Sequence, residues 1–150
     1  MRLLALLIFS ATFVGCSPAT KASFDVSIRN RSSGPLTVGF VKRGSPFEQD
    51  WASPEELTNL PPSRQPSLWG FVVEQGKTAE VRVHGEFSGG ASAYLRVYAG
   101  DHPLVDLLAM SRGTGSRLDI ALQPGRNNAF VITDPGAKLT AQLSRPERTP

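Results

Sequence analysis

The chain has 150 residues and a formal net charge of +3, a length that suits one domain with a real hydrophobic core. Its twelve arginines are scattered singly between apolar residues, whereas nucleic-acid binders gather such charge in a patch or stripe. The single cysteine excludes an internal disulfide and a zinc site built on cysteines. The fold is therefore expected to depend on packing rather than on covalent or metal cross-links.

The first residues have the pattern of an export signal. Arg2 precedes an apolar run over residues 3–14, and the small residue Gly15 stands directly before Cys16. A positive start, an apolar stretch and a small residue before the cut are the marks of a secretory signal. The run is too short for a membrane-spanning helix, which needs about 20 residues.

With the sequence Phe13-Val14-Gly15-Cys16, this segment resembles the lipobox of a bacterial lipoprotein signal. The first lipobox position is usually aliphatic, and here it is a phenylalanine. The resemblance covers only the first sixteen residues. The alternative is a plain secreted protein with a coincidental cysteine.

The lipoprotein resemblance implies an address and an anchor. Residues 1–15 would be removed, Cys16 would become the acylated N-terminus, and residues 16–22 would form the tether. Several acyl chains hold a protein durably on a membrane, where one chain would not. Ser17, in place of Asp, implies an outer-membrane protein that faces the periplasm.

Alternation of apolar and polar residues predicts strands through most of residues 23–144, the expected domain. The expected strands lie at residues 23–29, 36–40, 68–74, 78–87, 92–99, 117–122, 128–133 and 139–143. Residues 104–110 are either a strand or a helical turn. Residues 113–115 are expected to form a hairpin turn, and residues 145–150 a disordered tail.

Seven to nine short strands, about 8–14 residues apart, predict an all-β fold, a single antiparallel β-sandwich. The rhythm resembles an immunoglobulin- or transthyretin-like module, although the cysteine–tryptophan–cysteine hallmark of antibody-type domains is absent. The apolar phase of the strands predicts the core: Phe24, Val26, Ile28, Leu36, Val38, Phe40, Val81, Val83, Leu95, Val97, Leu118, Ile120, Leu122, Phe130 and Ile132.

Residues 44–67 interrupt the rhythm with five prolines. Ser53, Pro54 and Glu56 match a capping box for a short helix. The loop and its border carry the candidate binding surface: Phe47, Trp51, Leu57 and Trp69. These side chains either plug the flank of the sandwich as a small second core or form a surface for recognition, for which loops on a rigid scaffold are often used.

Catalytic patterns are absent. His84 stands at a strand end and His102 in a turn beside Asp101, without the partner spacing of a metal site. We therefore expect no catalytic residue, metal or cofactor, and predict a membrane-tethered, non-catalytic binding or structural module for an envelope protein or polymer. The alternative is a small envelope hydrolase or metal-dependent enzyme assembled from scattered residues such as these three.

The anchor and the fold together predict an orientation. If successive strands run antiparallel, the end beside the tether also carries the long loop. That end would gather Lys42, Arg43, Arg64, Arg112 and Arg117 with Phe47 and Trp51. Basic residues are attracted to anionic lipids and aromatic rings settle at the interface, so this end is predicted to dock on the membrane through both. The alternative is that the charges are solvated and the domain tumbles on its tether.

Overall fold

The alternating segments form eight strands in the computed structural model, which describes residues 18–111 and 117–144. The predicted signal peptide, Cys16, the turn at residues 113–115 and the tail at residues 145–150 lie outside the described residues. The strands are β1 (Thr20–Asn30), β2 (Leu36–Arg43), β3 (Phe71–Val73), β4 (Thr78–Phe87), β5 (Ser92–Ala99), β6 (Arg117–Ala121), β7 (Asn127–Thr133) and β8 (Thr140–Leu143).

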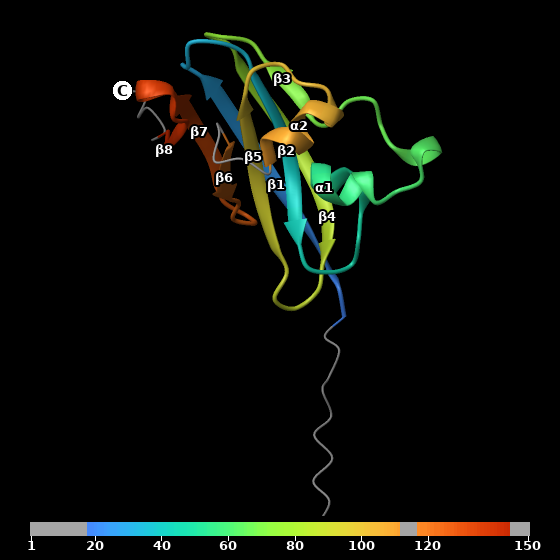
Figure 1. The fold of residues 1–150 in the computed structure, drawn as a ribbon. Coiled ribbons are helices and arrows are strands. Elements are labelled where there is room, and N and C mark those ends of the chain that lie inside the picture. Colours follow the sequence, from blue (N-terminus) through green and yellow to red (C-terminus); the bar gives the residue numbers. More distant parts are fainter. Residues whose placement is uncertain (1–17, 112–116, 145–150) are drawn as a thin grey trace, which may run out of the picture.

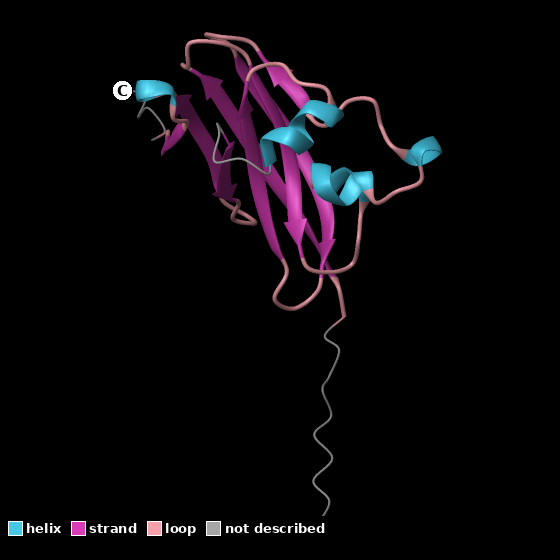
Figure 2. Cartoon of the chain, in the orientation of Figure 1, coloured by secondary structure: helices cyan, strands magenta, loops and turns pink. Residues whose placement is uncertain are grey.

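The strands build two four-stranded sheets, in the orders β4-β1-β7-β8 and β3-β2-β5-β6. The sheets pack face to face, which confirms the all-β sandwich (Figures 1 and 2). The helices are α1 (Pro54–Thr58) and α2 (Leu104–Ser111), with 3-10 turns η1 (Gln49–Trp51), η2 (Pro62–Arg64) and η3 (Pro135–Ala137). No helix in the described part of the chain has the length and apolar character needed to cross a membrane.

Neighbouring strands run antiparallel with one exception. β1 and β7 are parallel, with Asp25 opposite Asn127 and Asn30 opposite Ile132. The turn at residues 122–126 carries the chain from one sheet to the other, so β7 enters beside β1 from the same end. The spacing of strands and turns in the sequence did not indicate this passage between the sheets.

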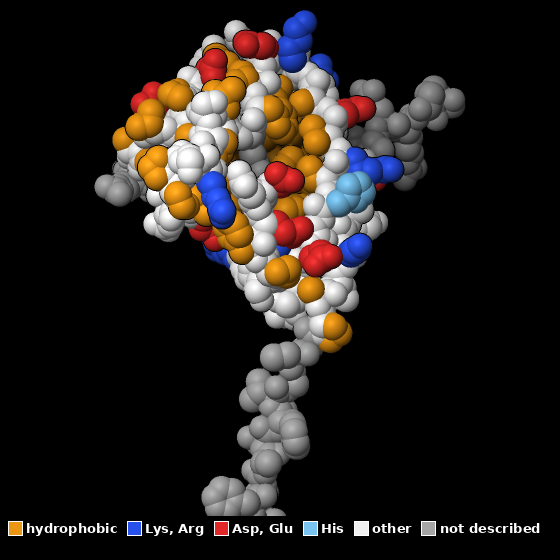
Figure 3. All heavy atoms as spheres, turned by 90° about the vertical axis from the view of Figure 1, so that its right-hand side faces the viewer, with side chains coloured by type: hydrophobic (Ala, Val, Ile, Leu, Met, Phe, Trp, Pro, Cys, Tyr) orange, Lys and Arg blue, Asp and Glu red, His pale blue; other side chains and the backbone are white. Residues whose placement is uncertain are grey.

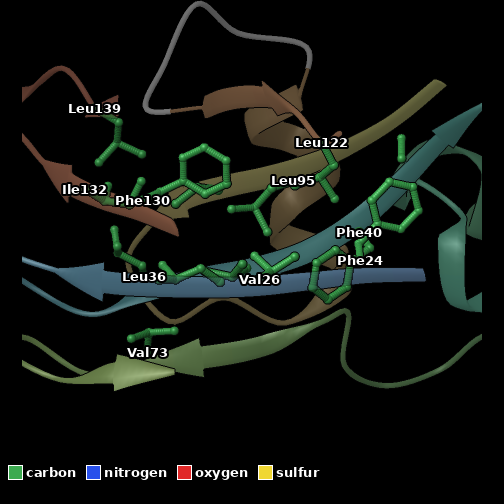
Figure 4. Packing of buried hydrophobic residues seen from close by; sticks show 14 of the residues in the cluster. Phe24, Val26, Leu36, Phe40, Val73, Leu95, Leu122, Phe130, Ile132 and Leu139 are labelled. Atoms are coloured by element: carbon green, nitrogen blue, oxygen red, sulfur yellow. The ribbon is translucent and has the colours of Figure 1, made fainter. Parts of the chain in front are cut away.

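The predicted core is confirmed. Eleven of the fifteen predicted residues are buried in the cluster between the sheets (Figure 4), and the other four, Val81, Val83, Leu118 and Ile120, pack against it. Ile28, Leu36 and Leu95 are fully buried, whereas Val81 and Ile120 are half-buried. The difference follows from position, because β4 and β6 each have a neighbour on one side only.

Three strands differ by three residues from the predicted boundaries, and one of them is β2, which ends at Arg43 rather than at residue 40. β1 begins at Thr20 rather than at residue 23, because Thr20 pairs with Phe87 across the sheet, and the segment predicted as a tether is correspondingly shorter. β3 contains only three residues of the expected strand at residues 68–74. Gly70 explains this: it has a φ of +69°, and a Cβ there would lie 1.9 Å from the Val38 carbonyl oxygen. The chain bends at this point.

The outer face of the β3-β2-β5-β6 sheet is also apolar, and it is covered. The long loop with α1, together with α2, lies across this face (Figure 2). Residues 104–110, left open between strand and helical turn, form most of α2. A second hydrophobic cluster results, with Val41, Ala52, Leu57, Trp69, Tyr98, Leu104 and Leu107 buried in it.

Candidate binding surface

Three of the four predicted binding residues are buried. Trp51 and Leu57 are each 2% exposed and Trp69 is 5% exposed, whereas Phe47 is 57% exposed. A binding surface formed by all four residues is therefore wrong, and the plug alternative describes the buried three. Their apolar bulk fills two separate cores that the strands leave incomplete.

Trp69 belongs to the second cluster. Its ring packs edge-on against Tyr98, with centroids 5.6 Å apart, and its indole N–H donates to the Ala52 carbonyl at 2.9 Å. The ring lies directly on Gly39 of β2, where a Cβ would come within 2.6 Å of it. The absence of a side chain at Gly39 thus lets the Trp69 ring lie directly on the sheet.

Trp51 closes the main core at the end where the chain enters. Its ring contacts Phe24, Phe40 and Phe87 at centroid distances of 5.5, 5.8 and 5.3 Å. Its N–H donates to the His84 carbonyl at 2.7 Å. The capping box that follows is present as predicted, with the Ser53 hydroxyl accepting from the Glu56 amide.

The histidines do not come together. His84 is exposed on β4 opposite Ser23, near the end where the chain enters. His102 follows β5 at the other end, where its Nε2 lies 2.7 Å from the Ala99 carbonyl oxygen. Asp101 is the sequence neighbour of His102, so it lies with that histidine and not with His84. Within residues 18–111 and 117–144, no group of three or more His, Cys, Asp or Glu residues could hold a metal ion.

A charged cluster ties α1 to the sheet. The nearly buried Arg96 of β5 makes two bonds to Asp119 of β6, at 2.8 and 3.1 Å, and a third to Glu55 of α1 at 3.1 Å. Burial acts to lower the pKa of Arg96, but the contacts with Asp119 outweigh it and the pKa is raised. We assign this cluster a structural role, because its groups satisfy one another.

β4 is an edge strand, and half of its free edge is closed. The Glu86 amide donates to the Glu48 carboxylate at 3.0 Å, and its carbonyl accepts from the buried Lys42 at 2.9 Å. The indole N–H of Trp51 donates to the carbonyl of His84. The hydrogen bond from Lys42 holds the pKa of Glu48 below its ordinary value, although burial opposes this.

The other half of the edge is open. Backbone groups alternate in direction along a strand, so those of Glu80 and Arg82 point off the same edge as those of His84 and Glu86. Among the residues that the structure describes, none bonds to these outward amides and carbonyls. We call residues 78–83 the open edge.

The open edge separates two unlike surfaces. On the inner side, Val81 and Val83 are half-buried, as is Phe71 in β3. Figure 3 looks onto this side of the molecule and shows hydrophobic side chains in a recess. On the outer side, a polar hollow of about 580 Å³ lies across β4, β1 and β7, and the Asp25–Arg82 ion pair borders it.

The sequence predicted the strand β4 at its correct position, but not that β4 lies at the edge of a sheet. One signal was available, since Glu80, Arg82, His84 and Glu86 put a charged or titratable group at every second position. Such a row marks a strand face exposed to solvent, and charged residues are common where such a strand lies at an edge. Comparison with known proteins finds no relative: no family model, no curated protein and no solved structure matches the chain.

Proposed function

We propose that the protein is a membrane-tethered, non-catalytic binding module that takes an extended peptide segment at its open edge. The observation that carries this is the contrast along β4. Glu48 and Trp51 close one half of the edge, while Glu80 and Arg82 keep unpaired backbone groups in the other half. Native proteins usually protect such edges, and strand addition is a common way of binding extended peptides.

The surfaces on the two sides of β4 indicate which side chains a bound peptide would carry. Successive side chains of an added strand point to opposite faces. Apolar side chains would enter the recess beside Val81 and Val83, and polar ones would lie in the outer hollow. There, Glu80 favours a basic residue, whereas Arg82 is already paired with Asp25. The expected partner is therefore a protein segment with alternating apolar and charged residues.

The membrane tether rests on the sequence. The lipobox resemblance at residues 13–16 supports acylation of Cys16, and Ser17 supports sorting to the outer membrane with the domain facing the periplasm. Cys16→Ser should move the protein from the membrane to the soluble fraction after cell fractionation. Retention of this variant on the membrane would contradict the anchor.

Peptide binding can be tested without knowing the partner. The mature Cys16→Ser chain would be panned against a library of random peptides, and enriched peptides titrated against variants. Glu80→Pro removes an amide that faces solvent, so it blocks strand addition without breaking the ladder to β1. Glu80→Thr removes the same charge and keeps the amide.

The expected result is enrichment of alternating peptides that bind the Glu80→Thr variant and not the Glu80→Pro variant. Amide hydrogen exchange should show slower exchange at Glu80 and Arg82 in the complex. Equal binding by both variants, or enriched peptides that leave these two amides unprotected, would place recognition elsewhere.

A further inference from the structure

The end of the sandwich where the chain enters is built from two loops that pack together. The Ser88 amide and hydroxyl both donate to the Ser45 carbonyl, at 3.0 and 2.7 Å. The turn at residues 88–91 follows the residue that pairs with Thr20, the first residue of β1. Residues 44–47 and 88–91 thus form one surface, the tip, beside the start of β1 (Figure 1).

The tip carries no charge. Residues 44–47 are Gly-Ser-Pro-Phe and residues 88–91 are Ser-Gly-Gly-Ala. Phe47 is 57% exposed, and no core cluster includes it. Taking ions out of water is costly, so a surface without ions can approach lipid with little penalty, and an aromatic ring is favoured at the lipid interface.

The length of chain before β1 indicates which surface the tip meets. Thr20 is four residues beyond Cys16, a span of at most roughly 14 Å. If Cys16 carries lipid, as the proposed function holds, the tip lies within that distance of the bilayer. The tether would therefore hold the tip close to a lipid surface, which is the expected partner.

Of the five cations that the sequence suggested for docking, Arg112 lies outside the described residues and Arg64 is exposed in the long loop. Lys42 is buried and bound to Glu48. Arg43 stacks on Tyr94, 4.6 Å from the ring centroid. Arg117 pairs opposite Tyr98, at the far end of β5. Lys42, Arg43 and Arg117 therefore do not form the predicted cluster of free basic charges at the tip.

We propose that the tip rests on the membrane with the Phe47 ring in the interfacial region of the lipid. This contact is apolar, so it depends little on salt. It rests on the proposed tether for its location, and it orients the sandwich with its long axis away from the bilayer. Phe47 is thus the one predicted binding residue that keeps a recognition role, toward lipid.

The test uses the Cys16→Ser chain, which contains no other cysteine. Phe47→Cys and Leu143→Cys would each carry an environment-sensitive fluorophore, and vesicles of phosphatidylethanolamine and phosphatidylglycerol would be added. Leu143 is the matched control: it is 71% exposed, and its partner Phe130 pairs with Ile28, eight residues along β1 from Thr20.

Emission at position 47 should shift to the blue, and emission at position 143 should not. In the unlabelled chain, Phe47→Ala should lower vesicle partitioning about five-fold, as expected for partial burial of an aromatic ring. Leu143→Ala and added salt should each change it less than about two-fold. Equal shifts at both positions, or no shift at position 47 with vesicles in excess, would overturn the tip contact. Cell fractionation of Cys16→Ser tests the tether separately.

Discussion

Replacing Gly39 by alanine gives a direct test of the second core. Gly39 has no positive φ, so alanine fits its backbone and the only obstacle is space. The added Cβ would lie 2.6, 2.7 and 2.9 Å from three carbon atoms of the Trp69 ring. The ring cannot stay where it is, and the loop that it holds must shift with it.

The cost follows from three contributions. Overpacking a well-packed site costs about 1–3 kcal/mol, and loss of the Trp69 hydrogen bond to Ala52 adds about 1 kcal/mol. The change to alanine also stabilises the fold by about 0.5–1 kcal/mol, because glycine is unfavourable inside a strand. The net expectation is a free energy of unfolding lower by about 2 kcal/mol, or a Tm lower by about 6–12 °C for a domain of this size.

A double-mutant cycle isolates the contact. Urea unfolding would be measured for Gly39→Ala, Trp69→Ala and the double variant. Without the indole there is no clash, so Gly39→Ala in the Trp69→Ala background should be neutral or stabilising by up to about 1 kcal/mol. Gly34→Ala is the control, because a Cβ there meets no atom within 4 Å.

Two outcomes would refute this reasoning. If Gly39→Ala costs no more than Gly34→Ala, the loop does not lie on the sheet through this contact. If its cost persists without the indole, the strain arises elsewhere in β2. Either outcome would reopen the question of whether Trp69 is available for binding.

The remaining predictions concern the main core and the closed half of the β4 edge. Ile28→Ala should cost about 3–5 kcal/mol and Ile120→Ala about 1–3 kcal/mol by urea unfolding, because only the first residue is fully buried; equal costs would mean that burial does not set them. Glu48→Gln should lower the free energy of unfolding by about 1–2 kcal/mol at pH 7. Because the folded pKa of Glu48 is depressed, this difference should be complete above its ordinary value of 4.5 and vanish as the pH falls through the lowered pKa. A difference that stayed constant down to pH 3 would argue against the carboxylate contact.

Local features of the fold could be predicted from the sequence. Alternation with a period of two assigns each strand side chain to a face, so the inward positions of Val26, Val38 and Val97 follow from their neighbours alone. The capping box at Ser53 is equally local, because its two partners are three residues apart. These predictions needed no knowledge of what lies across the sheet.

The tertiary structure decides where the side chains of Trp51 and Trp69 are buried. In sequence, both are aromatic residues in or beside an irregular loop. One enters the main core through Phe24 and Phe87, and the other lies on Gly39 outside it. Whether a loop side chain is buried depends on the shape of a surface formed by distant strands, and no local periodicity encodes that shape.

The open edge was decided in the same way. The alternation of β4 predicts a half-buried strand whether it has one neighbour or two. It lies at an edge because β1 is its only neighbour in the sheet, whereas β1 also pairs with β7, about a hundred residues further along the chain. The position of a strand in a sheet depends on such long-range pairing, so only the assembled sheet shows which backbone groups remain free to bind.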